Sequence, residues 1–197
     1  MPNDQKDRRQ ELDLLEGAFG STGVIVAKVT PDVLGAPTPC ADWDVRAVLE
    51  HATNVVAMFA GTASRTGVPT ELPSEASEWV GDPVPTFDRV TKATLAAWSE
   101  SGALDGTCHL PTGREVPASI AIRIGFIDAL VHGWDLAKAL DLDPTLDPAL
   151  ATAALEASKM IMSDSLRGPN GAFGAEVTVA PSASPTDQLV AFLGRRP

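Results

Sequence analysis

The feature that most constrains the fold of this chain is the stretch between Ser119 and Leu140, which is apolar on nearly every side. Its large apolar side chains are Ile120, Ile122, Ile124, Phe126, Ile127, Leu130, Val131, Trp134 and Leu136. At 3.6 residues per turn these positions surround the whole axis, so they predict a helix, capped by Ser119, with no face for water. Other helices have to cover it. This places it in the middle of a bundle, with Ile124, Ile127 and Val131 inaccessible.

Three earlier segments carry the helical periodicity that such a bundle needs. The predicted helices span residues 11–29, 45–59 and 86–102. Asp42 is the expected N-cap of the second helix and Thr86 that of the third, because short polar side chains accept hydrogen bonds from the first free backbone N–H groups. Residues 61–85 and 103–118 contain many Gly, Pro, Ser and Thr residues and are predicted to be loops.

The C-terminal part predicts smaller elements. Asp147, with a proline directly after it, opens an extra helix that runs to about Leu166. Residues 175–180 alternate between polar and apolar and could pair as a short strand. Ser184 caps a final short helix that Gly194 closes.

These elements together predict an all-α fold. The chain has 197 residues, which suits one domain with an appendage. We expect a four-helix bundle over residues 1–143 and a helical appendage over residues 144–197 that packs on the bundle.

Charge and cysteine content restrict the partners and the compartment. The 15 Lys and Arg against 26 Asp and Glu give a net charge of −11, which disfavours nucleic acid and anionic membranes. No apolar run approaches the roughly 20 residues that cross a bilayer, and the first residues contain no apolar core of a signal peptide. Cys40 and Cys108 could form one disulfide, but a reduced pair is the default. We therefore expect a cytoplasmic protein.

The polar residues of the central helix suggest a metal site. Asp128 and His132 are four residues apart and project from one helical face, with Asp135 three residues further on. His51 lies at the edge of the apolar face of the second predicted helix. Two imidazoles and a carboxylate can bind a divalent ion and leave positions open for water or substrate. The alternative is an Asp–His pair that is simply hydrogen-bonded in the core.

Other combinations of reactive residues are weaker candidates. Cys108 and His109 are adjacent, which makes joint ligation of one ion awkward. Cys40 has no nucleophile signature around it, and no serine lies in a G-x-S-x-G elbow. Trp43 and Trp134 stand at predicted helix positions, where they pack in a core or form the wall of a pocket.

Two motifs make the chain resemble a known family. The run from Thr38 to Val45, continuing to Leu49-Glu50-His51, resembles the second-helix segment of the mycothiol-dependent maleylpyruvate isomerase metal-binding domain. The run from Asp128 to Ala137, with its His-Gly-Trp-Asp-Leu core, resembles the fourth helix of that domain. The segments 173–177 and 193–197 look like a short actinobacterial branch of the family. The domain belongs to the DinB/YfiT-like superfamily, so the resemblance implies a DinB-like four-helix bundle.

The resemblance also implies a cofactor and a chemistry. It implies a divalent ion, zinc before Ni²⁺ or another first-row metal, held by His51, Asp128 and His132. Asp135, three residues after His132, is either a hydrogen-bond partner of that histidine or an ordinary surface carboxylate. The isomerase has Glu where this chain has Asp128, and a larger C-terminal domain.

The implied function is a mycothiol-dependent isomerase or S-transferase, in which the metal activates the thiol as a cosubstrate. Its partners would be a small-molecule thiol and an electrophilic substrate, with a homodimer as a further candidate assembly. The alternative is a metal- or ligand-binding protein without turnover. No catalytic residue beyond the three ligands is assigned.

Overall fold

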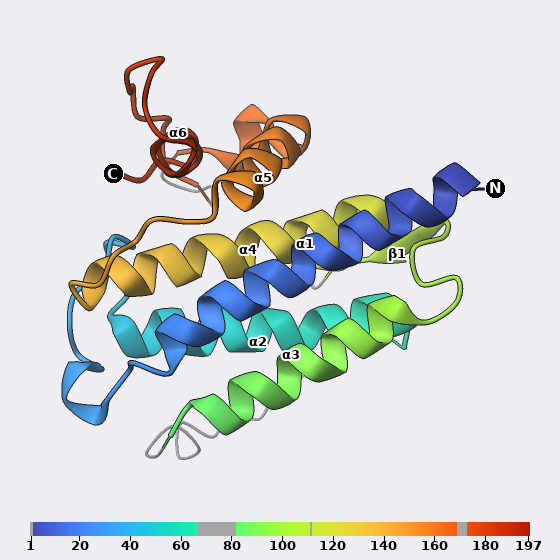
Figure 1. Ribbon diagram of the computed structural model, residues 1–197, viewed down its shortest axis with the longest axis horizontal. Helices are drawn as coiled ribbons and strands as arrows, with labels where there is room; N and C mark the ends of the chain where they lie inside the picture. The colour runs from blue at the N-terminus through green and yellow to red at the C-terminus, as the bar shows by residue number, and fades with distance from the viewer. Residues whose placement is uncertain (1, 67–81, 111, 169–172) are drawn as a thin grey trace.

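The computed structural model describes residues 2–66, 82–110, 112–168 and 173–197. Four long helices form a bundle: α1 (Pro2–Val26), α2 (Val45–Ser64), α3 (Val84–Ser99) and α4 (Ala118–Ala139). Figure 1 shows α1 and α4 running in one direction and α2 and α3 in the other. α4 contacts α1 and α2, and α3 contacts the same two helices, which closes the bundle. The predicted all-α four-helix bundle is therefore confirmed.

α4 is the most buried helix of the bundle, as its composition predicts. Of its 22 residues 15 are buried, against 9 of the 20 in α2. Ile127 and Val131 are buried, but the expectation that Ile124 is inaccessible is wrong, because it is half-buried. Ile124 shares one stripe of α4 with Ile120 and Asp128, four residues away on either side, and the neighbouring helices cover this stripe incompletely.

The close approach of α1 to α4 depends on a glycine. A Cβ at Gly133 would come too close to Thr22 Oγ1 and would lie 3.3 Å from Thr22 Cα. Thr22 donates a hydrogen bond of 2.8 Å to the carbonyl oxygen of Ala129 and joins the two helices at this point. Glycine is therefore required one residue after His132.

The N-cap of α2 lies two residues later than predicted. Asp44, not Asp42, is the N-cap, and its side chain accepts a hydrogen bond of 2.9 Å from the backbone N–H of Ala47. The short 3₁₀ helix η1 (Pro31–Val33) and a turn precede it, and an isolated bridge between Pro37 and Asp44 holds the loop.

The predicted caps of the next two helices are also wrong. α3 begins at Val84, two residues before Thr86, and α4 begins at Ala118, so Ser119 lies inside the helix. Prolines precede or occupy the first positions of both helices, and a proline lacks the N–H group that a capping side chain would otherwise satisfy. Of the predicted loop 61–85, residues up to 64 continue α2, and residues 67–81 lie outside the described part of the chain.

A small hairpin replaces part of the second predicted loop. β1 (Thr107–His109) pairs antiparallel with β2 (Glu115–Pro117), and Cys108 lies opposite Val116. Successive side chains point to opposite faces of a strand, so Cys108 is buried while His109 is exposed. Burial raises the pKa of the Cys108 thiol. Both cysteines are free, so they form no disulfide.

The C-terminal segment packs on one side of the bundle. α5 (Pro148–Ile161) contacts α4 and α1, and α6 (Pro185–Phe192) contacts α5 (Figure 1). Asp147 and Ser184 cap these helices as predicted. The boundary placed at residue 143 remains a prediction. No helix in the described part of the chain is long and apolar enough to cross a membrane.

Two C-terminal predictions are wrong. α5 ends at Ile161 and gives way to the 3₁₀ helix η3 (Asp164–Leu166), so it does not reach Leu166. Residues 175–180 form no strand in the described structure. The N–H group of Val177 donates instead to the carbonyl oxygen of Ala191 near the end of α6 at 2.9 Å.

Candidate metal centre

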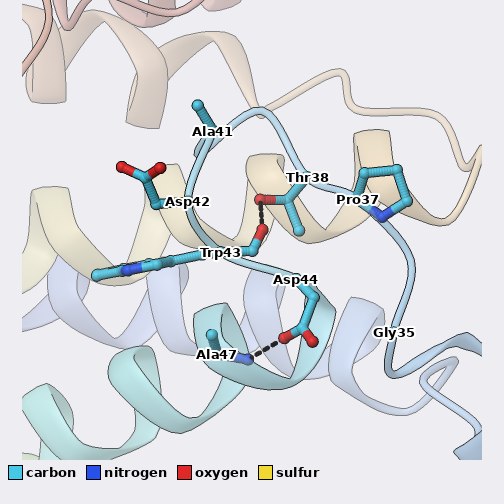
Figure 2. A pocket seen from close by; sticks show the side chains of 8 residues that line it. All are labelled: Gly35, Pro37, Thr38, Ala41, Asp42, Trp43, Asp44 and Ala47. Atoms are coloured by element: carbon cyan, nitrogen blue, oxygen red, sulfur yellow. Dashed lines mark hydrogen bonds between the residues drawn. The ribbon is translucent and has the colours of Figure 1, made fainter.

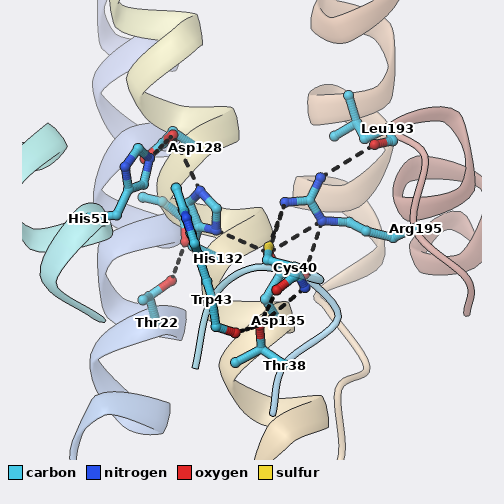
Figure 3. Close-up of polar contacts among 11 residues, drawn as sticks. Thr22, Thr38, Cys40, Trp43, His51, Asp128, His132, Asp135, Leu193 and Arg195 are labelled. Atoms are coloured by element: carbon cyan, nitrogen blue, oxygen red, sulfur yellow. Dashed lines mark hydrogen bonds and ion pairs between the residues drawn. The ribbon is translucent and has the colours of Figure 1, made fainter. Parts of the chain in front are cut away.

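The structure brings the three predicted ligands together between α2 and α4. His51 lies on α2, and Asp128 and His132 lie on the facing surface of α4 (Figure 3). Asp128 Oδ1 is 3.5 Å from Nε2 of His51 and 3.6 Å from Nε2 of His132. One ligand atom from each residue lies within 4.8 Å of the other two. The two histidines, 81 positions apart in the sequence, thus share one carboxylate.

These separations fit a metal ion better than direct hydrogen bonds. At 3.5–3.6 Å the contacts with Asp128 Oδ1 are too long for good hydrogen bonds. Zinc bonds of about 2.0–2.1 Å in a tetrahedron place two donor atoms about 3.3 Å apart. The other oxygen, Asp128 Oδ2, is buried without a hydrogen-bond partner, although a buried carboxylate oxygen ordinarily has one. The residues present therefore fit a divalent cation.

Asp135 sets the orientation of the His132 ring. Its Oδ2 lies 3.0 Å from Nδ1 of His132, and its side chain is completely buried. A bond at Nδ1 leaves Nε2 to face Asp128, which is how histidine ligands of metals are commonly held. Of the two interpretations that the sequence left open for Asp135, the structure shows the partner of His132 and not a surface carboxylate.

Arg195 is the residue of this cluster that sequence reasoning missed. Its Nε donates to Asp135 Oδ1 at 2.9 Å and its Nη2 to Oδ2 at 2.8 Å (Figure 3). Arg195 lies sixty residues after Asp135, in the segment that follows α6. A signal existed in the sequence, because a carboxylate on an all-round apolar helix needs a cationic partner. Nothing in the sequence indicated which arginine it would be.

Cys40 completes this cluster from the loop before α2. Its Sγ lies 3.3 Å from Asp135 Oδ2 and 3.8 Å from Arg195 Nη2. Cys40, His132 and Asp135 also place ligand atoms within 4.8 Å of one another. The guanidinium of Arg195 already balances the Asp135 carboxylate and would repel a cation, so we describe this group as a hydrogen-bonded cluster.

Charges around His132 shift the pKa values of the cluster. Burial opposes a charged imidazole, but the Asp128 carboxylate and hydrogen bonds to Asp135 and Cys40 outweigh it and raise the pKa of His132 to about 10. Burial likewise opposes a charged Asp135, but hydrogen bonds from His132 and Arg195 lower the pKa of Asp135 to about 2. The two neighbouring carboxylates thus favour the protonated form of the His132 imidazole.

Trp43 forms one wall of the site. The sequence predicted it at a helix position, but it lies in the loop before α2. It is half-buried in the loop before α2, with its ring centroid 4.6 Å from that of His51 and 5.9 Å from that of His132. Thr38 holds this loop by donating a hydrogen bond of 2.7 Å to the carbonyl oxygen of Trp43 (Figure 2). Trp134, in contrast, is buried in the core.

The outer side of this loop borders an open depression of about 460 Å³. Its lining residues are Gly35, Pro37, Thr38, Ala41, Asp42, Trp43, Asp44 and Ala47 (Figure 2). Trp43 therefore lines this depression and also lies beside the rings of the two histidines.

The sequence matches the family model of the mycothiol maleylpyruvate isomerase N-terminal domain over residues 20–137. This region is more than half of the chain and contains His51, Asp128 and His132. The chain belongs to this family. The resemblance stated from the two sequence motifs is confirmed.

Two relatives match most of the chain. Two uncharacterized proteins of Mycobacterium tuberculosis, from strains CDC 1551 / Oshkosh and ATCC 25618 / H37Rv, are each 32% identical over 171 residues. That is 87% of this chain and 90% of each relative. The crystal structure of the mycothiol-dependent maleylpyruvate isomerase matches with a TM-score of 0.52 at 16% identity.

The structural match to the isomerase is partial. It covers 66% of this chain and 60% of the isomerase, so the chain spans less than two thirds of that protein. At this identity the match shows a shared fold. The family model itself ends at residue 137, so Arg195 lies outside the matched region although it contacts Asp135 inside it.

Proposed function

We propose that this chain binds one divalent ion, zinc before other first-row metals, through His51, Asp128 and His132. We further propose that the site activates a low-molecular-weight thiol of the mycothiol class for isomerisation or S-transfer on an electrophilic substrate. The observation that carries the proposal is the arrangement of two Nε2 atoms around Asp128 Oδ1, with Oδ2 of the same carboxylate buried and unpartnered. A cytoplasmic location, where such thiols are reduced, belongs to the same proposal.

When bound, a zinc ion would favour the deprotonated form of a coordinating thiol, which is the nucleophilic form. The chain's own residues prepare the site for this. Asp135 keeps Nε2 of His132 directed at Asp128, and Trp43 covers the two imidazoles on one side. Asp128 lies on the incompletely covered stripe of α4, where its side chain keeps 21% exposure and leaves a route for a small molecule.

The comparisons support this chemistry in general terms. The family and the isomerase of similar fold are both named for mycothiol, so their names support a thiol cosubstrate. The identity of the electrophile is open, because the chain spans 60% of the isomerase whose structure it resembles. A metal-binding protein without turnover is the alternative outcome of the test.

The test is the metal content of untagged protein by elemental analysis, with about one divalent ion expected per chain. His51→Ala and His132→Ala should each lose most of the metal, because each removes one of three ligands. His109→Ala is the matched control, since His109 is exposed on β1. If the two ligand variants keep the metal content of His109→Ala, the site is assigned wrongly. If metal is bound but no thiol is, the binding-protein alternative holds.

A further inference from the structure

The segment after α6 returns to the bundle and delivers one side chain to the candidate metal centre. Gly194 has a φ of +85°, and a Cβ there would lie 2.7 Å from Gly174 Cα, so only glycine makes this turn. The next residue, Arg195, is anchored by its backbone N–H, which donates to the carbonyl oxygen of Val190 at 2.9 Å. Its side chain also donates to the carbonyl oxygen of Leu193 at 3.3 Å. These two hydrogen bonds, both to residues of its own segment, help to fix the position of the Arg195 guanidinium next to α4.

Asp135 depends on that guanidinium. Its side chain is completely buried in α4, where an ionised carboxylate needs charged or hydrogen-bonding partners. Arg195 supplies a two-pronged pair through Nε and Nη2, the strongest geometry for an arginine and a carboxylate. The remaining contacts of the same carboxylate are Cys40 and Nδ1 of His132. Arg195, a residue of the appendage, therefore fixes the side-chain conformation of Asp135. Asp135 in turn fixes the orientation of the His132 ring.

We infer that Arg195 is a positioning residue for the metal centre: it clamps Asp135, and Asp135 aims His132 at the ion. The appendage thereby completes a site whose proposed ligands all lie on the bundle. The inference rests on the proposed metal site but concerns a residue outside the matched family region. Partners of this kind typically change metal affinity about 10- to 100-fold when they are removed.

The competing explanation is that Arg195 only fastens the appendage, and a control within the appendage separates the two. Arg167 donates to the carbonyl oxygens of Phe192 and Gly174 at 2.8 and 3.2 Å, and its guanidinium stacks over the Phe192 ring. Arg167 therefore anchors the same segment, but among the described residues it forms no hydrogen bond or ion pair with the metal centre.

The experiment measures zinc affinity by competition with a chromophoric chelator, in full-length protein checked for folding by circular dichroism. Arg195→Gln should bind zinc about 10- to 100-fold more weakly than wild type, and Arg167→Gln should match wild type. Arg195→Lys keeps the charge but not the paired geometry, so it should fall between them. Equal affinity in Arg195→Gln and wild type, or an equal loss in Arg167→Gln, would overturn the inference.

A second readout does not need the metal. In metal-free protein, the proton on Nδ1 of His132 is hydrogen-bonded to Asp135, so proton NMR should show that it exchanges slowly with solvent. Arg195→Gln should accelerate this exchange, whereas Arg167→Gln should leave it unchanged. If wild type binds no zinc, the proposed function fails, and the exchange rates alone decide the role of Arg195. If Arg195→Gln does not fold, Arg195→Lys decides by both readouts, and its equivalence to wild type in both overturns the inference.

Discussion

At the scale of single residues, the centre of the site is a histidine on α4 that lies between two carboxylates of the same helix. His132 lies between Asp128 and Asp135, four and three residues away, and each carboxylate faces a different nitrogen of the ring. The two acids have different roles. Asp135 is saturated by Arg195, Cys40 and His132, whereas Asp128 keeps one buried oxygen without a partner. The unsatisfied acid is the one expected to gain most from a cation.

We predict that His132 couples the stability of the metal-free protein to pH. Its pKa is raised from 6.5 to about 10 in the folded state, so the folded chain binds this proton more tightly than the unfolded chain. The resulting stabilisation is complete below about pH 6.5 and is lost as the pH rises towards about 10. Urea unfolding in the presence of a chelator, compared between about pH 6 and about pH 9, measures it.

The variant His132→Gln should lose this pH dependence, and His109→Gln should keep it, because His109 is an exposed residue of β1 and does not belong to the cluster around Asp128 and Asp135. Equal slopes in the two variants would show that His132 is not a cation in the folded protein.

At the scale of elements, the position of α4 against α1 and α2 decides whether the site can form. His51 and His132 lie on different helices, so a small shift of α4 changes the distance between their donor atoms. Thr22 on α1 contacts α4 where Gly133 follows His132, and its hydroxyl binds the carbonyl oxygen of Ala129. The helix contact and the metal centre therefore occupy the same turn of α4.

We predict that Gly133→Ala destabilises the protein by about 1–3 kcal/mol, because the added methyl group must push Thr22 and its backbone away. Gly20→Ala is the matched control. Gly20 lies inside α1 with nothing within 4 Å of an added Cβ, so alanine should stabilise that helix by up to about 1 kcal/mol. Chemical denaturation of both metal-free variants gives the two values. A neutral Gly133→Ala would mean that α1 and α4 are not in close contact there.

At the scale of the whole molecule, bundle and appendage meet at the candidate site. The three proposed ligands come from α2 and α4, Trp43 and Cys40 come from the loop before α2, and Arg195 comes from the last residues of the chain. The net charge of −11 does not oppose a small thiol as strongly as it opposes nucleic acid, because a protonated thiol carries no charge whereas nucleic acid is a polyanion.

We predict that mycothiol binds through sulfur to protein loaded with cobalt. A sulfur-to-cobalt charge-transfer absorption should appear on titration, and an analogue with oxygen in place of sulfur should give none, because an alcohol resists deprotonation near neutral pH. Binding should strengthen as pH rises, since it releases the thiol proton. His132→Ala, which lacks the metal, is the blank. An unchanged spectrum with saturating mycothiol, in protein shown to carry cobalt, would contradict the thiol-activating function.

The sequence by itself determined the features that depend on neighbouring residues. The all-round apolar pattern of α4 required a surrounding bundle, and the spacing of Asp128, His132 and Asp135 placed them on one side of it, because helical geometry is set within one or two turns. Asp147 and Ser184 capped the last two helices as expected for the same reason. His51 entered the candidate set through its helix position and the family resemblance.

Only the tertiary structure decided the features that depend on the path of the loops. The N-cap of α2 at Asp44 leaves Trp43 in the preceding loop, where its ring lies beside those of the two histidines. Arg195 reaches Asp135 across sixty residues because α5 and α6 pack on the bundle and Gly194 turns the chain back. A sequence pattern reports local periodicity, whereas the partner of a buried charge is chosen by packing between distant segments.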